Sequence, residues 1–183
     1  MLWSHGDVVG TQAVLPSMLK SDREAKGVKG GVLRLVYQTA LALQIGHSVI
    51  GENEILGDGM LADYDLEAGT VRLRPEVPAF LFGNDLDESA LVAVLAKEMR
   101  PMSYGAMRSR LTRTAWAYTP AMFVNCEKDV ALPVEKMEES RDARETCPAA
   151  FERVQRCQAG HAPFVIMPDW VVEVLRRAAG ENL

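Results

Sequence analysis

The sequence predicts an α/β fold with a mostly parallel sheet, because strand-like and helix-like segments alternate along the chain. Residues 32–37 and 120–126 are short apolar runs rich in β-forming residues, and residues 154–158 are expected to form a last short strand. Helices are expected at residues 134–144 and 170–179, after the second and third of these strands. Strands that are joined through helices in this way pair in parallel and carry helices on the faces of the sheet.

The start of the chain is expected to add one helix and one loop to this pattern. Residues 8–19 have an apolar side that is typical of a helix, although Pro16 disturbs its later part. Residues 21–31 are charged and rich in glycine, which predicts a loop before the first long strand.

A mostly helical insertion is predicted between the strands at residues 32–37 and 120–126. Its first part, residues 41–59, is ambiguous because glycines interrupt it, and a small hairpin with its turn at residues 67–69 follows. Asn84 or Asp85 then caps a helix that ends before Pro101, and a more basic helix follows at residues 103–113. The insertion lies where a lid over a site would lie. The chain is therefore divided into residues 1–40, a cap at residues 41–118, and residues 119–183.

Composition is that of one ordinary globular domain. The chain has 183 residues, of which 48% are apolar and 25% charged, and its net charge of −5 disfavours a nucleic-acid partner. No apolar run reaches the roughly 18 residues of a membrane-spanning helix, and no signal-peptide pattern opens the sequence. Cys126, Cys147 and Cys157 are odd in number and widely spaced, which suggests neither a disulfide framework nor a zinc site. We expect a cytoplasmic protein without a metal or cofactor.

Three side chains with complementary chemistry follow predicted strands. Ser4 follows the first three residues, Asp129 follows the strand at residues 120–126, and His161 follows the last strand. Ligands of open parallel sheets bind beyond the carboxyl ends of the strands, so these side chains are expected at one edge. A nucleophile, an acid and a histidine in this order are typical of a catalytic triad.

The motifs around these residues resemble one branch of the α/β-hydrolases, the branch of methylesterases and hydroxynitrile lyases, with fungal members in particular. Residues 159–164, A-G-H-A-P-F, are similar to its A-G-H-S-P-F, and residues 125–133, N-C-E-K-D-V-A-L-P, are similar to its C-T-x-D-x-A-I-P. Residues 82–86, F-G-N-D-L, resemble the F-Y-N-D-L that opens a cap helix, and residues 4–10 resemble the nucleophile elbow. Residues 30–37 and R-P-M-S at residues 100–103 extend the resemblance to nearly the whole chain.

This resemblance implies a partial α/β-hydrolase fold and a serine hydrolase acting on a small ester, thioester or lactone. Ser4 would attack, His161 would carry the proton, and Asp129 would orient the imidazole. His5 would lend its backbone N–H, more than its ring, to an oxyanion hole. The substrate class implied is a small, largely apolar acyl compound enclosed by the cap.

Several residues also permit other interpretations. Ser4 read alone is a common type of helix N-cap, and Ser48 in G-H-S-V-I-G imitates a nucleophile motif whose second glycine comes one residue late. Glu127 is the nearest rival to Asp129, which in turn resembles a turn aspartate. His161 could be a structural histidine.

The sequence departs from the family pattern around Ser4. Trp3 stands where a histidine is common, Asp7 stands where a glycine is common, and only three residues precede Ser4. The family's second oxyanion donor lies in a strand-rich half that would precede them, so the chain is expected to be N-terminally truncated. Two alternatives follow: a non-catalytic binding or assembly protein, and a cyclase or lyase that uses the same pocket. An open sheet edge near Trp3 would also favour a homodimer.

Overall fold

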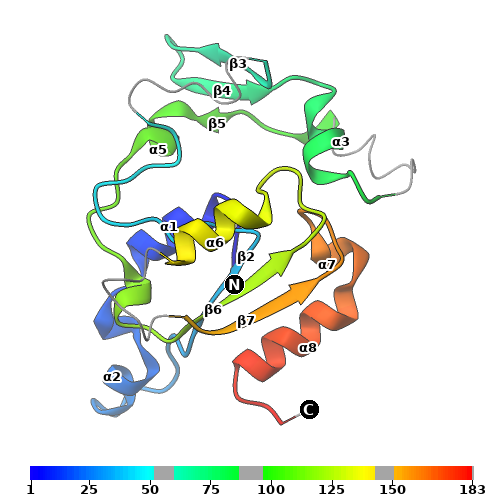
Figure 1. Cartoon of the computed structure of the whole chain (residues 1–183). Helices are drawn as coiled ribbons and strands as arrows, with labels where there is room; N and C mark the ends of the chain where they lie inside the picture. Colours follow the sequence, from blue (N-terminus) through cyan, green and yellow to red (C-terminus); the bar gives the residue numbers. More distant parts are fainter. Residues whose placement is uncertain (52–59, 87–96, 143–150, 183) are drawn as a thin grey trace.

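The structure is a computed structural model that describes residues 1–51, 60–86, 97–142 and 151–182. Its main sheet has four strands in the order β1-β2-β6-β7, and every neighbouring pair is parallel (Figure 1). The strands are β1 (Leu2–Trp3), β2 (Leu35–Gln38), β6 (Ala121–Cys126) and β7 (Phe151–Cys157). The predicted α/β class with a parallel sheet is thus confirmed.

Helices cover both faces of this sheet. On one face, Leu35, Tyr37 and Phe123 pack with Trp116 of the 3-10 turn η3 (Ala115–Ala117) and with Val14, next to α1 (Gly6–Ala13). On the other face, strand residues pack against α8 (Pro168–Ala178) through Val174, Trp170 and Leu175. Successive side chains of β2 and β6 point to opposite faces of the sheet, so the sheet has one apolar core on each face.

Several predicted boundaries at the start of the chain were wrong. The helix expected at residues 8–19 begins at Gly6 and ends at Ala13, because Val14 and Leu15 are extended before Pro16 opens the 3-10 turn η1 (Pro16–Met18). The expected loop contains a short helix, α2 (Lys20–Glu24). The strand expected from residue 32 begins at Leu35, although Val32 forms an isolated bridge with Leu19.

The predictions for the C-terminal elements were closer. Strand β7 begins three residues before the predicted start, and α8 begins at Pro168. Helix α6 (Val134–Asp142) begins as expected, and its predicted last two residues lie outside the described part. A short helix that was not predicted, α7 (Pro163–Ile166), separates β7 from α8.

The segment between β2 and β6, residues 41–118, carries a second sheet. Strands β3 (Ala62–Asp65), β4 (Thr70–Leu73) and β5 (Met102–Ser103) pair antiparallel, which confirms the hairpin and adds a third strand. Helices α3 (Val77–Phe82) and α5 (Tyr104–Arg108) flank this sheet, and Val71, Leu73 and Leu81 lie in its core. The described part of the insertion therefore contains more strand than predicted, and most of the helix expected after Asn84 lies outside the described residues.

The small sheet and its helices lie apart from the main sheet, beyond its upper end in Figure 1. Within the described ranges, no helix has the length and apolar character needed to cross a membrane.

Candidate active site

Ser4 occupies a sharp turn between strand β1 and helix α1. Its φ of 50° is in the left-handed region, which a residue with a side chain adopts at a cost of about 1–3 kcal/mol. Its backbone N–H donates to Gln38 O at 3.3 Å, which anchors the turn to β2. Its carbonyl accepts from the Asp7 N–H at 3.0 Å, which starts the helix at once. A strained strand-turn-helix of this kind presents the Ser4 side chain above the carboxyl end of the sheet.

Asp129 is fixed in the turn that follows β6. One carboxylate oxygen, Oδ1, accepts from the N–H groups of Ala131 at 2.9 Å and Leu132 at 3.0 Å. The other, Oδ2, lies 2.9 Å from Nδ1 of His161. Both side chains are almost completely buried, with 0% of Asp129 and 2% of His161 exposed. Both carboxylate oxygens are thus engaged, so the carboxylate has one orientation toward the imidazole.

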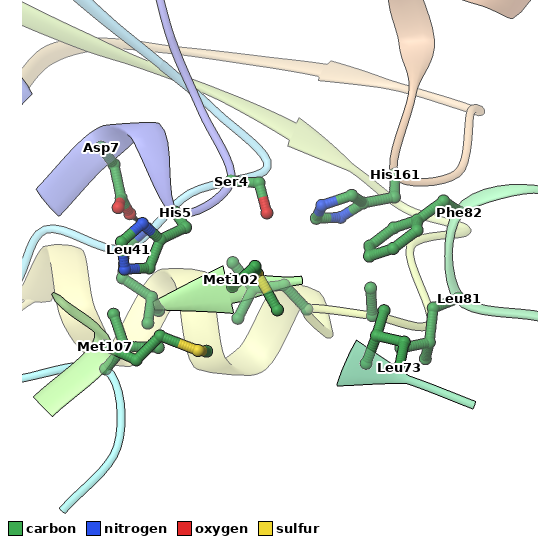
Figure 2. A pocket seen from close by; sticks show the side chains of 13 residues that line it. Ser4, His5, Asp7, Leu41, Leu73, Leu81, Phe82, Met102, Met107 and His161 are labelled. Atoms are coloured by element: carbon green, nitrogen blue, oxygen red, sulfur yellow. Dashed lines mark hydrogen bonds between the residues drawn. The ribbon is translucent and has the colours of Figure 1, made fainter. Parts of the chain in front are cut away.

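His161 is held from its backbone as well as from its ring. Its carbonyl accepts from Trp3 Nε1 at 2.8 Å and from Thr39 Oγ1 at 3.1 Å. The rings of Phe82 and Trp3 lie against the imidazole, with centroids at 5.0 and 5.4 Å. Figure 2 shows the imidazole directed across the pocket toward Ser4. Its Nε2 is buried and meets no hydrogen-bond partner in the described part of the chain.

Ser4 and His161 line one apolar pocket of about 170 Å³. The remaining walls come mainly from the segment between β2 and β6, including Leu73, Leu81 and Met107 (Figure 2). A second hollow of about 430 Å³ shares Ser4, His5 and Phe82 with the first and continues toward Trp3 and Phe164. Apolar walls with a few polar groups are typical of pockets for small molecules.

Asp7 and His5 add two ionisable groups to this pocket. The Asp7 carboxylate accepts from the N–H groups of Leu41 and Val8. Burial raises the pKa of the Asp7 carboxyl to about 7, against the lowering effect of those two hydrogen bonds. Burial lowers the pKa of the His5 imidazole, and its Nε2 has no partner among the described residues.

The rival residues are placed elsewhere. Ser48 belongs to the inserted segment, where its hydroxyl donates to Ile50 O at 2.8 Å. Glu127 is exposed and pairs with Arg156 at 3.7 Å. Asp129, not Glu127, is the acid that contacts His161.

Two features of the site region escaped the sequence analysis. The ring of His5 lines the pocket, although only its backbone was singled out. Cys126 and Cys157, free cysteines on β6 and β7, are paired in register with their sulfur atoms 3.4 Å apart. Adjacent parallel strands bring them together across 31 residues of sequence, and their spacing gave no signal of that.

Two curated proteins that are named as hydrolases are similar to this chain in sequence. The α/β hydrolase nvfD of Aspergillus novofumigatus is 32% identical over 157 residues, which are 85% of this chain and 60% of that protein. The "Probable hydrolase R7" of a Phoma species is 26% identical over 84% of this chain and 62% of its own length. The chain belongs to the α/β-hydrolase superfamily.

Solved α/β-hydrolases agree in fold with most of the chain. A pyrethroid hydrolase from Sphingobium faniae superposes with a TM-score of 0.65 at 17% identity, over 98% of this chain and 69% of its own. The Arabidopsis methylesterase MES16 gives 0.67 at 17% identity, over 97% and 67%. Polyneuridine aldehyde esterase gives 0.57 at 15% identity, over 93% and 76%. At these identities the likeness establishes the partial α/β-hydrolase fold. No protein-family profile matches the chain.

The α/β-hydrolase chain described here spans about three-fifths of the length of the two curated relatives. Ser4, Asp129 and His161 lie at the carboxyl ends of β1, β6 and β7 of the shared fold.

Proposed function

We propose that this chain carries the nucleophile, acid and base of a serine hydrolase that cleaves a small apolar ester, thioester or lactone. The observation that carries this proposal is the buried Asp129–His161 pair, whose free Nε2 faces the pocket that Ser4 also lines. Relatives named as hydrolases and structural neighbours named as esterases support the same reaction class.

The proposed mechanism gives each group one step. His161 Nε2 accepts the proton of the Ser4 hydroxyl as its oxygen attacks the carbonyl carbon of the substrate. Asp129 accepts the Nδ1–H of His161, which keeps Nε2 free as the base and stabilises the imidazolium that forms. The imidazolium then returns the proton to the departing alcohol, thiol or alkoxide, and water repeats the sequence on the acyl-serine.

The negative oxygen of the tetrahedral intermediate would meet the backbone N–H of His5. His5 directly follows Ser4, and no acceptor within the described residues uses its N–H. One donor of this kind is worth about 10²–10³ in rate. The segment of residues 41–118 would act as the lid, because its apolar side chains form much of the pocket wall.

A fluorophosphonate probe tests this proposal, since it reacts with an activated serine and leaves a covalent adduct for peptide mapping. We expect the adduct on Ser4 of the folded chain, with loss of labelling in Ser4→Ala. Ser48→Ala is the matched control and should label as the parent does. An adduct on Ser48, or none on either serine, would contradict the assignment.

A second candidate function is supported by Asp7. Its carboxyl lines the pocket next to Ser4 and His5, and in its ionised form it would repel a developing oxyanion. A non-catalytic binding protein that retains the pocket would tolerate this charge. The two candidates are separated by the hydrolysis of short p-nitrophenyl esters: a parent rate well above that of Ser4→Ala excludes the binding protein.

A further inference from the structure

Two neighbouring side chains of the inserted segment contact the loops that carry the acid and the histidine. Asn84 donates through Nδ2 to the carbonyl of Lys128 at 2.8 Å. Asp85 accepts, through a carboxylate oxygen, the backbone N–H of Gly160. Lys128 directly precedes Asp129, and Gly160 directly precedes His161.

The two loops are also bonded to each other at this point. The N–H of Lys128 donates to Ala159 O at 3.1 Å, so the loop that carries Asp129 and the loop that carries His161 are hydrogen-bonded to each other. Asn84 and Asp85, which belong to the inserted segment, each add one hydrogen bond to these two loops. Two residues earlier, Phe82 places its ring against the imidazole of His161.

Gly160 leaves just enough room for this contact. A Cβ at Gly160 would lie 2.5 Å from Asn84 Oδ1 and 2.7 Å from Asp85 Oδ1, well inside van der Waals distance. A residue with a side chain at this position would displace both groups. The close approach thus depends on glycine immediately before His161.

We propose that Asn84 and Asp85 are positioning residues for the Asp129–His161 pair. Each holds a backbone group of the residue before one member of the pair, so together they set the distance and angle between carboxylate and imidazole. The contacts of the inserted segment with the two loops then control whether His161 is an efficient base. Neither residue lines the pockets that Ser4 lines, so the effect falls on the pair itself and not on substrate contacts. The kinetic consequence rests on the hydrolase function proposed above, whereas the geometric consequence does not.

Removal of either side chain should loosen one loop, and misplacement by a fraction of an ångström is costly in catalysis. For Asn84→Ala and Asp85→Ala we expect kcat on a p-nitrophenyl ester to fall about ten- to a hundred-fold with KM nearly constant. Asp85→Asn should recover most of the loss, because its amide oxygen still accepts from the Gly160 N–H. Asp63→Asn is the matched control: it removes an exposed carboxylate of the inserted segment, paired with Arg74, away from both loops. It should leave kcat unchanged.

Proton NMR gives a readout that needs no turnover. The Nδ1 proton of His161, buried against Asp129, should give a low-field signal that exchanges slowly with water in the parent chain. In Asn84→Ala and Asp85→Ala the signal should broaden or exchange at least about ten times faster. Asp85→Asn and Asp63→Asn should retain it.

The two proposals fail in different ways. If the parent chain hydrolyses no ester but the His161 proton signals of parent and variants are as expected, the hydrolase function is overturned and the positioning role is retained. Alanine variants with the parent kcat and parent exchange rate would overturn the positioning role. A parent chain without a protected His161 proton would overturn it as well.

Discussion

Oδ2 of Asp129 lies 2.9 Å from Nδ1 of His161 in a site that water hardly reaches. Because Oδ1 is occupied by the N–H groups of Ala131 and Leu132, the carboxylate cannot rotate to offer its other oxygen. The imidazole is therefore confined to the tautomer with its proton on Nδ1 when it is neutral. Nε2, on the pocket side, is then an acceptor.

This arrangement predicts a large effect of Asp129→Asn. The amide oxygen would keep the bonds to Ala131 and Leu132, which leaves the NH₂ group facing Nδ1 and forces the imidazole proton to Nε2. We expect kcat for ester hydrolysis to fall by about 10³–10⁴ with little change in the unfolding midpoint. Glu127→Gln, two residues away and exposed, should change kcat less than two-fold. A loss smaller than about tenfold in Asp129→Asn would show that Asp129 does not orient the base.

The sequence alone was sufficient for the fold class, because strand and helix patterns alternate along the chain. Ser4, Asp129 and His161 were singled out because each lies in the connection after a strand, and their catalytic roles stay predictions. A parallel sheet then brings Asp129 and His161 to one edge whatever the intervening sequence is. Contacts that depend on the register of paired strands or on the position of the inserted segment could not be predicted from the sequence. Trp3 reaching the His161 carbonyl is one example, and Cys126 facing Cys157 is another.

Local rules also failed where tertiary structure or a single residue overrode them. The apolar pattern of residues 8–19 suggested a helix disturbed only in its later part, but Val14 and Leu15 are extended and the helix stops at Ala13; Pro16 disfavours a helical backbone at Leu15. Asn84 or Asp85 was expected to cap a helix, whereas their side chains contact Lys128 and Gly160; most of that helix lies outside the described residues.

The outer edge of β1 predicts self-association. No strand pairs with that edge in the described part of the chain. Met1, directly before β1, is 56% exposed, and Val9 of α1, a helix that contacts β1, is 59% exposed. We expect a dimer by light scattering after size exclusion. Val9→Glu should shift the mass toward the monomer by placing a charge at the contact. Val172→Glu, on α8 and 51% exposed, is the control and should leave the mass unchanged. A parent chain that is monomeric at high concentration would refute the prediction.

Gly160→Ala should disturb the site without unfolding the chain. The added methyl group would overlap Asn84 Oδ1 and Asp85 Oδ1, and overpacking of this kind costs about 1–3 kcal/mol in the free energy of unfolding. We expect kcat to fall about tenfold or more, because the displacement occurs directly before His161. Gly105→Ala is the matched control, since its Cβ would come no closer than 3.8 Å to Ser103 Oγ. Equal effects of the two substitutions on kcat would contradict this reasoning.

Asp7 predicts an unusual dependence of stability on pH. Its pKa of about 7 in the fold lies above the 3.8 of a free aspartate, so between these values the folded chain holds a proton that the unfolded chain releases. The contribution of Asp7 to the free energy of unfolding is therefore intact below about pH 4. It is lost progressively as the pH rises to about 7, by about 1.4 kcal/mol for each pKa unit of elevation.

Urea unfolding of the parent chain and of Asp7→Asn at pH 5 and pH 8 measures this contribution. Asn cannot ionise, so the decline in stability from pH 5 to pH 8 should be smaller in the variant by at least about 1 kcal/mol. Asp63→Asn removes an exposed carboxylate and should keep the decline of the parent. The same ionisation brings a negative charge beside Ser4 and His5, so Asp7→Asn should also hydrolyse esters faster than the parent at pH 8 and hardly faster at pH 5. Parallel stability profiles in parent and variant would mean that Asp7 is ionised throughout this range, with the two N–H groups of Leu41 and Val8 outweighing its burial.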